Sequence, residues 1–155
     1  MISRRHFLVL GGIAVAVPVK AQLPPNIAEI RQAALKEAIA KVTGNAEVRR
    51  GRVKLEIPPL IDNGNAVPLS VEVESPMSAA DHVKAIHVFT ERNPQPYVLT
   101  AHLGPRAGKA RLATRARIGD TGEVIAIAQM SDGSFWSESV GVIVTLSACL
   151  EEGLI

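Results

Sequence analysis

The sequence predicts a mainly β protein, an immunoglobulin-like antiparallel β-sandwich of about seven strands with one N-terminal helix. Short segments in which apolar and polar residues alternate recur from Arg52 to the end of the chain. Pro, Gly, Asn and Asp separate these segments, and no long helix-forming stretch lies between them. Because the Cys…Trp…Cys spacing of true immunoglobulin domains is absent, the expected likeness concerns architecture alone.

The first 21 residues are expected to be an export signal. Residues 3–8 have the twin-arginine pattern, with Arg4 and Arg5 as the pair. The apolar run over residues 9–19 is too short to span a bilayer, and residues 19–21 fit a signal-peptidase site. This order of features makes a buried N-terminal helix the weaker alternative. We therefore expect a periplasmic protein, exported by the twin-arginine route, with no membrane anchor after cleavage.

Removal of the signal reverses the sign of the net charge. The whole chain has 17 Lys and Arg against 15 Asp and Glu, a formal net charge of +2. The signal holds three basic residues, Arg4, Arg5 and Lys20, and no acidic one, so 14 basic residues remain against 15 acidic ones, a net charge of −1. The basic precursor is therefore no evidence for a nucleic-acid partner.

After the signal, we expect a helical segment over residues 22–50, a β-sandwich over residues 51–146 and a C-terminal arm over residues 147–155. Asn26 and Glu29 have the spacing of a capping box, and Gly44 is placed to end a helix. The apolar residues at helical spacing between these signals are Ile27, Ile30, Ala34, Ala38 and Val42. These signals predict one amphipathic helix over residues 27–43.

The first two strands are expected over residues 52–57 and 67–74, where Val, Leu and Ile alternate with charged or small residues. Residues 58–59 are two prolines, which end the first strand, and the Asp-Asn-Gly-Asn run at residues 62–65 is a strong turn signal. Pro68 indicates that the second strand lies at an edge or begins there.

Five more strands are expected before the arm. They cover residues 82–90, 97–103, 110–118, 123–130 and 140–146. In the last one, apolar residues alternate with smaller or polar neighbours, which predicts one buried face formed by Val140, Val142, Val144 and Leu146. Because the strands contain many Val, Ile and Leu and few aromatic residues, we expect an aliphatic core.

The histidines do not predict a metal site. His82 and His87 are five residues apart on one expected strand, so they point to opposite faces. With His102, they are expected to be surface or structural histidines. The chain also has no Ser-His-acid set and no phosphate-binding loop, so we do not predict an enzyme.

Two other sets of side chains allow two interpretations each. Basic residues line one face of the expected strand at 110–118, namely Lys109, Arg111, Arg115 and Arg117. A solvated face is the simpler interpretation, and attraction of an anion or an acidic partner is the alternative. Trp136 follows a tight turn, where it either caps the end of the sandwich or contributes to a contact surface.

Cys149 is the only cysteine of the chain and follows the last expected strand. In an exported protein, an odd cysteine forms an intermolecular disulfide, is a buried inert thiol or is a reactive thiol. A position in a terminal segment disfavours burial. Cys149 is therefore the candidate for the chemistry of this chain.

Several motifs occur in order along the chain. They are Pro-Leu-Ile-Asp-Asn-Gly-Asn-Ala-Val-Pro at residues 59–68, Ser-Pro-Met at 75–77, Val-Lys-Ala-Ile-His-Val-Phe at 83–89, Asn-Pro at 93–94 and Met-Ser-Asp-Gly-Ser-Phe-Trp at 130–136. Together with the helix and the twin-arginine signal, they resemble the SoxY family of sulfur-carrier proteins over nearly the whole chain up to about Thr145.

The resemblance implies a sandwich that forms a heterodimer with a SoxZ-like subunit and is exported with it. It implies that Cys149 covalently carries thiosulfate-derived sulfur, with no other cofactor. Separate sulfur-oxidising enzymes then act on this cargo through transient contacts. A c-type cytochrome pair attaches it oxidatively, a manganese hydrolase releases sulfate, and a molybdenum–haem dehydrogenase oxidises the bound sulfur. The chain itself would be a carrier and not an enzyme.

The arm departs from the family pattern, in which the cysteine stands in Gly-Gly-Cys-Gly-Gly. Here Leu150, Glu151 and Glu152 follow Cys149, and they are bulkier than glycine. The two carboxylates disfavour the thiolate and repel an anionic cargo. A second hypothesis therefore stays open, in which a SoxY-like sandwich has lost the carrier arm and acts only as a binding or structural partner. A reading-frame change after about Thr145 is a further explanation of the altered ending.

Overall fold

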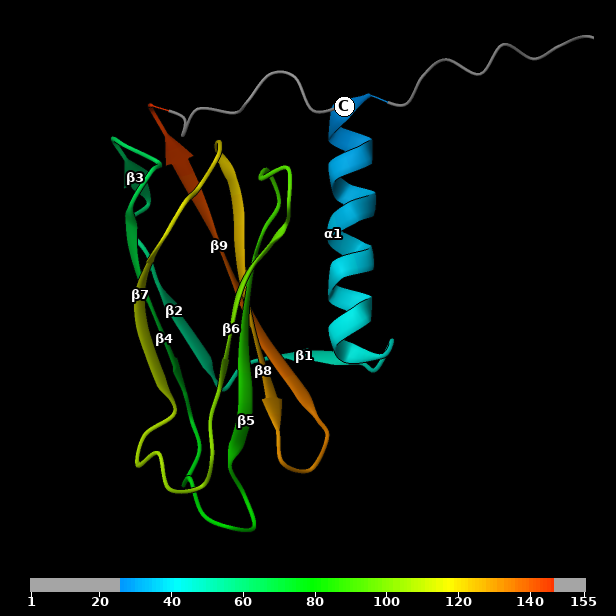
Figure 1. Cartoon of the computed structure of the whole chain (residues 1–155), viewed down its shortest axis with the longest axis vertical. Helices are drawn as coiled ribbons and strands as arrows, with labels where there is room; N and C mark the ends of the chain where they lie inside the picture. The colour runs from blue at the N-terminus through cyan, green and yellow to red at the C-terminus, as the bar shows by residue number, and fades with distance from the viewer. Residues whose placement is uncertain (1–25, 147–155) are drawn as a thin grey trace, which may run out of the picture.

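The computed structural model describes residues 26–146 and confirms the predicted mainly β sandwich. Within these residues the chain forms one helix and nine strands. They are α1 (Ile27–Thr43), β1 (Val48–Arg50), β2 (Val53–Glu56), β3 (Leu60–Ile61), β4 (Val67–Val73), β5 (Val83–Thr90), β6 (Tyr97–His102), β7 (Arg111–Ala116), β8 (Gly122–Met130) and β9 (Phe135–Val144). Two sheets face each other, and α1 stands beside the outer face of the larger one (Figure 1). No helix in the described part of the chain is long and apolar enough to cross a membrane.

Strand β9 connects the parts of the sandwich. The larger sheet has the order β1-β9-β8-β5-β6, and β3 also pairs with β9. The smaller sheet has the order β2-β4-β7. Since β8 pairs along one edge of β9 from Phe135 to Val142, β1 and β3 share its other edge, β1 near the start and β3 at the end. Between them, the Glu138 carboxylate accepts a hydrogen bond from the N–H of Leu55 in β2, which ties the two sheets together.

The two strands that the sequence analysis missed are β1 and β3. They have three and two residues, too few to show an alternating pattern. Strand β9 also begins at Phe135 and ends at Val144, whereas the prediction was 140–146. Leu146 therefore lies beyond the strand and is 62% exposed, so its expected place on the buried face was wrong.

Helix α1 begins and ends where its capping residues predict. The side chain of Asn26 accepts a hydrogen bond from the N–H of Glu29 at 2.9 Å, and Gly44 adopts a left-handed conformation with φ of 61°. The predicted apolar stripe is wrong in its first half, because Ile27 and Ile30 are 53% and 45% exposed. The helix contacts the sheet through its second half instead, with Leu35, Ala38, Ile39 and Val42.

Two apolar clusters hold the fold together. The larger one lies between the two sheets, and its fully buried members include Ile86, Val88 and Val124. Its buried members in the described chain are aliphatic residues and methionines without an aromatic residue, as the sequence predicts. The smaller cluster lies under α1 on the outer face of the larger sheet and contains Phe89 and Phe135. Burial of these apolar surfaces is the main source of stability for both layers.

Candidate functional site

The predicted attachment residue, Cys149, lies outside the described residues, as do Arg4 and Arg5 of the predicted signal. The last described residue is Leu146, three positions before Cys149. An extended chain spans at most about 3.6 Å per residue, so Cys149 lies within about 11 Å of Leu146. We call Val144, Thr145 and Leu146 the arm base, because their position decides where the thiol can act.

The arm base is held on one side by the segment around β3. The N–H of Thr145 donates to the carbonyl of Ile61 at 2.9 Å, and the N–H of Gly64 donates to the carbonyl of Leu146 at 3.1 Å. The Thr145 hydroxyl lies 3.3 Å from the carbonyl oxygen of Asp62. These bonds fix the position of the chain as far as Leu146.

Thr121 holds the arm base on the other side. Its hydroxyl accepts a hydrogen bond from the N–H of Val144 at 2.9 Å and lies 3.4 Å from the Val144 carbonyl oxygen. Thr121 immediately precedes β8, so a single side chain bridges the start of β8 and the end of β9. Nothing in the sequence pattern marks this threonine, because its role depends on a contact between distant segments.

Thr121→Val is expected to loosen the arm base. The substitution keeps the shape of the side chain but removes the hydroxyl, which leaves the Val144 N–H without its partner, at a typical cost of about 1–3 kcal/mol. Hydrogen exchange of the Val144 and Thr145 amides, measured by NMR, should become roughly five-fold or more faster. Thr114→Val on β7 is the matched control, since that hydroxyl bonds only the adjacent carbonyl. Unchanged exchange at Val144 would contradict this role of Thr121.

Two of the motifs that carry the family resemblance meet beside the arm base. Asn93 accepts a hydrogen bond from the N–H of Gly119 at 2.6 Å and donates one to the carbonyl of Arg117 at 2.9 Å. The Arg117 guanidinium donates to the side-chain oxygen of Asn65 at 3.4 Å. The segments 59–68 and 93–94 are therefore connected through the end of β7, next to the segment that leads to Cys149.

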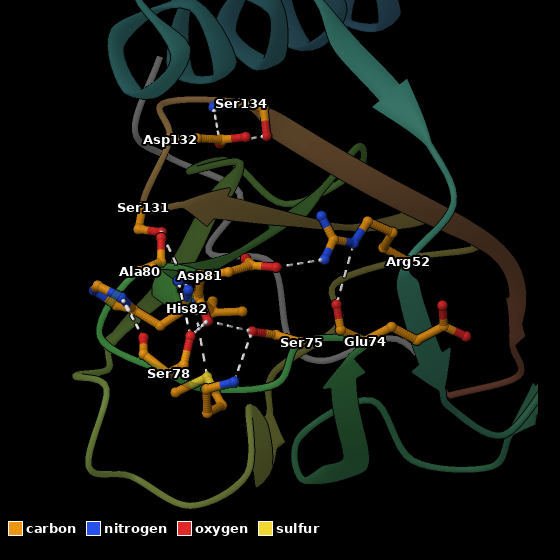
Figure 2. Close-up of polar contacts among 12 residues, drawn as sticks. Arg52, Glu74, Ser75, Ser78, Ala80, Asp81, His82, Ser131, Asp132 and Ser134 are labelled. Atoms are coloured by element: carbon orange, nitrogen blue, oxygen red, sulfur yellow. Dashed lines mark hydrogen bonds and ion pairs between the residues drawn. The ribbon is translucent and has the colours of Figure 1, made fainter.

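The segments 75–77 and 130–136 are both bonded to the loop at residues 78–82, near the start of β9, as Figure 2 shows. The Ser131 hydroxyl accepts a hydrogen bond from the N–H of His82 at 3.1 Å and donates to the carbonyl of Ala80 at 3.2 Å. The Ser75 hydroxyl accepts from the N–H of Met77 at 3.1 Å. Met77 is buried with a left-handed φ of 48°, a conformation that costs about 1–3 kcal/mol and is held by these contacts.

Trp136 is half-buried at this end of the sandwich. Its ring packs against the larger apolar cluster, and its indole N–H donates to the Ser134 hydroxyl at 3.2 Å. The guanidinium groups of Arg49 and Arg52 each lie 5.7 Å from the ring centroid. Arg52 also pairs with Asp81 at 3.5 Å, which connects the ring to the loop shown in Figure 2.

The histidines lie apart from the arm base. Nδ1 of His87 is 2.5 Å from the Thr100 hydroxyl, and the ring is buried on β5. Burial lowers the pKa of His87, and the nearby His102 lowers this pKa further. Nδ1 of His82 instead bonds the carbonyl of Ser78. Within the described residues, no group of three His, Cys, Asp or Glu side chains is arranged to hold a metal ion.

His87 is expected to make the stability depend on pH. Because its pKa is lower in the folded state, the unfolded state binds more protons as the pH falls through the ordinary value of about 6.5. The free energy of unfolding should therefore decrease between about pH 7.5 and pH 5. In urea denaturation, His87→Gln should show a smaller decrease than the wild-type chain. An equal decrease in wild type and His87→Gln would contradict this prediction.

Comparison with known proteins agrees with the resemblance. The family described as "Sulfur oxidation protein SoxY" matches residues 39–149. A comparison with curated proteins finds no match. Among solved structures, the chain is similar to the sulfur carrier protein SoxY from Chlorobium limicola f thiosulfatophilum, with 23% identity and a TM-score of 0.63 over 76% of this chain and 97% of that one.

Superoxide reductases share the fold as well. The superoxide reductase (neelaredoxin) from Ignicoccus hospitalis has 16% identity and a TM-score of 0.55 over 61% of this chain and 80% of that one. A putative superoxide reductase from Thermotoga maritima has 20% identity and a TM-score of 0.52 over 63% of this chain and 87% of that one. At these identities the likeness concerns the fold alone. The family match, in contrast, covers the motifs at both ends of β9 and reaches Cys149. The chain therefore belongs to the SoxY family.

Proposed function

We propose that this chain is a periplasmic carrier that covalently holds sulfur-compound intermediates on Cys149 during thiosulfate oxidation. The observation that carries the proposal is the family match, which extends to Cys149, the only cysteine of the chain. The structural likeness to a SoxY sulfur carrier supports it. The twin-arginine pattern with Arg4 and Arg5 supports export to the periplasm.

The attachment step forms one sulfur–sulfur bond. The Cys149 thiol loses its proton, and its sulfur bonds to the terminal sulfur of thiosulfate. Two electrons leave the pair of sulfur atoms, and the sulfur-oxidising cytochrome accepts them. The product is a cysteine that ends in a sulfonate group and carries one negative charge. No metal or organic cofactor is required on this chain, because the oxidant belongs to the partner enzyme.

The described residues would serve as a rigid support for this chemistry. The hydrogen bonds of Thr121 and Thr145 keep the arm base at a fixed place, so the position of Cys149 varies only over the few residues after Leu146. A short reach from a fixed base raises the local concentration of the thiol at a docked enzyme. The reactions would take place on separate enzymes, namely the cytochrome, the hydrolase and the dehydrogenase. A SoxZ-like subunit would complete the carrier as a heterodimer.

Intact-mass spectrometry tests this proposal. The chain, in complex with its SoxZ-like subunit, is incubated with thiosulfate and the oxidising cytochrome. We expect a thiosulfate-derived adduct that dithiothreitol removes and that never forms on Cys149→Ala. The absence of any adduct that depends on Cys149 would refute the carrier function.

A second function is favoured by the residues that follow Cys149. Leu150, Glu151 and Glu152 differ from the glycines of the family motif, which suits a chain that has kept the sandwich and lost the carrier arm. Such a chain would act only as a binding or structural partner. It would still co-purify with the SoxZ-like subunit, but a reconstituted system would oxidise thiosulfate at the full rate without its thiol.

A further inference from the structure

The exposed face of β7 carries a row of positive charge that ends beside the arm base. Strand β7 alternates as the sequence predicts, with exposed Arg111 and Arg115 and buried Ala116. It is an edge strand of the smaller sheet. Residues 93–119 contain five Lys and Arg and no Asp or Glu, so the charge of this segment is not balanced within the segment itself.

The balance of positive and negative charge differs between the two ends of β7. Arg111 lies opposite Glu72 in the sheet. The pKa of Glu56 is lowered mainly by its hydrogen bonds with Lys54 and Ser70, and Arg111 lowers it further. Arg115 lies opposite Pro68, which has no charge. Among the ion pairs of the described residues, none includes Arg115 or Arg117. The end of β7 nearest the arm base therefore has the uncompensated positive charge.

Gly64 connects this end of β7 to the arm base. The N–H of Ile118 donates to the Gly64 carbonyl at 2.8 Å, and the N–H of Gly64 donates to the Leu146 carbonyl at 3.1 Å. Hydrogen-bonded neighbouring chains lie about 4.8 Å apart, so the backbones of Ile118 and Leu146 are roughly 10 Å apart. Arg117 precedes Ile118 and bonds Asn65, the residue after Gly64.

The chain that follows Leu146 has the opposite charge. Residues 147–155 contain Glu151 and Glu152 and no basic residue. Glu151 is five positions beyond Leu146, and five extended residues span up to about 18 Å. Both carboxylates can therefore reach Arg115 and Arg117 without any rearrangement of the sandwich.

We propose that Arg115 and Arg117 bind Glu151 and Glu152, so that the arm lies back along β7 while no other protein engages Cys149. Opposite charges in reach of each other favour this contact at low ionic strength. Binding also brings the guanidinium groups close to the two carboxylates that otherwise disfavour the Cys149 thiolate. The acidic residues of the arm are then compatible with a reactive thiol, because the sandwich supplies their counter-charges.

Because Cys149 is the only cysteine, a nitroxide label attached to it reports where the arm lies. In the purified, nitrogen-15-labelled chain at low salt, we expect the label to broaden the amide signals of residues 113–118 more than those of Gly141 and Ile143 on the other sheet. At 1 M salt the Debye length falls to about 3 Å, and the difference should disappear. This measurement needs neither thiosulfate nor a partner.

Charge reversal tests which residues make the contact. Arg115→Glu with Arg117→Glu should remove the broadening along β7, and adding Glu151→Arg with Glu152→Arg should restore it. Each exposed ion pair changes an equilibrium constant by about two- to five-fold. The ratio of bound to unbound arm should therefore fall roughly 4- to 25-fold in the first variant, which loses two pairs. Arg106→Glu with Lys109→Glu makes the same charge change at the far end of β7 and should leave the broadening unchanged.

Several results would overturn the proposal. One is broadening that is equal on all sides of the arm base, or centred on the exposed pair Leu60 and Ile143. Another is a charge swap that fails to restore the contact. A third is a reversal that leaves the arm in place but weakens binding of an acidic partner, since the arginines would then belong to that partner. Failure to form the thiosulfate adduct while the arm still binds β7 would refute the carrier function alone.

Discussion

Cys149→Ser is expected to stop thiosulfate oxidation in a reconstituted system while the sandwich and its heterodimer remain intact. Serine has nearly the size of cysteine, but its hydroxyl cannot form the sulfur–sulfur bond that holds the cargo. Cys149 follows the last strand in the sequence, so the substitution removes no residue of the two described apolar clusters. Electron transfer to the cytochrome, followed by its reduction spectrum, should fall to the level measured without the carrier.

A relocated thiol provides the matched control. Ser147→Cys in the Cys149→Ser background returns a cysteine to the arm, two residues closer to Leu146. The reach of the thiol becomes shorter by about 7 Å. We therefore expect partial activity, which depends on how far the arm must extend into the active site of each enzyme. Full activity of Cys149→Ser itself, together with normal co-purification of the SoxZ-like subunit, would instead support the structural-partner function.

The fold was predictable where the signals are local. Asn26, Glu29 and Gly44 determine both ends of α1, because a helix cap involves only neighbouring residues. Six strands of the sandwich were placed nearly correctly from period-two alternation. The short strands β1 and β3 depend on parallel pairing with β9, a contact between segments about 85 residues apart. No window of sequence contains that information.

The helix shows the same limit. Ile27 and Ile30 fit a helical stripe as well as Leu35 and Ile39 do, and local spacing cannot decide between overlapping stripes. The packing of the sheet decides between them, because Phe89 and its neighbours contact only the second half of α1.

The candidate site could also be predicted only in part. The sequence identified the motifs, but it did not show that they lie in two groups at opposite ends of β9. Thr121 could not have been found, because a lone threonine carries no pattern.

Phe89→Ala is expected to lower the free energy of unfolding by about 3–5 kcal/mol, a large part of the roughly 5–15 kcal/mol typical of a domain. Phe89 is fully buried under α1. Its ring also contacts Tyr97 edge-on, with centroids 5.7 Å apart. Tyr97→Leu is the control, since Tyr97 is 45% exposed and its loss should cost only about 1 kcal/mol. Urea denaturation followed by circular dichroism measures both variants.

Phe89→Ala also tests whether the packing under α1 is independent of the contacts that hold the arm base. The arm base is held by Thr121 and by the segment around β3, and neither belongs to the cluster that contains Phe89. At a temperature where Phe89→Ala is still folded, the adduct on Cys149 should therefore form at the wild-type rate. A slower rate, in a sample that circular dichroism shows to be folded, would mean that the packing under α1 also positions the arm or its partner enzyme. Full stability of Phe89→Ala would show that α1 contributes little to the sandwich.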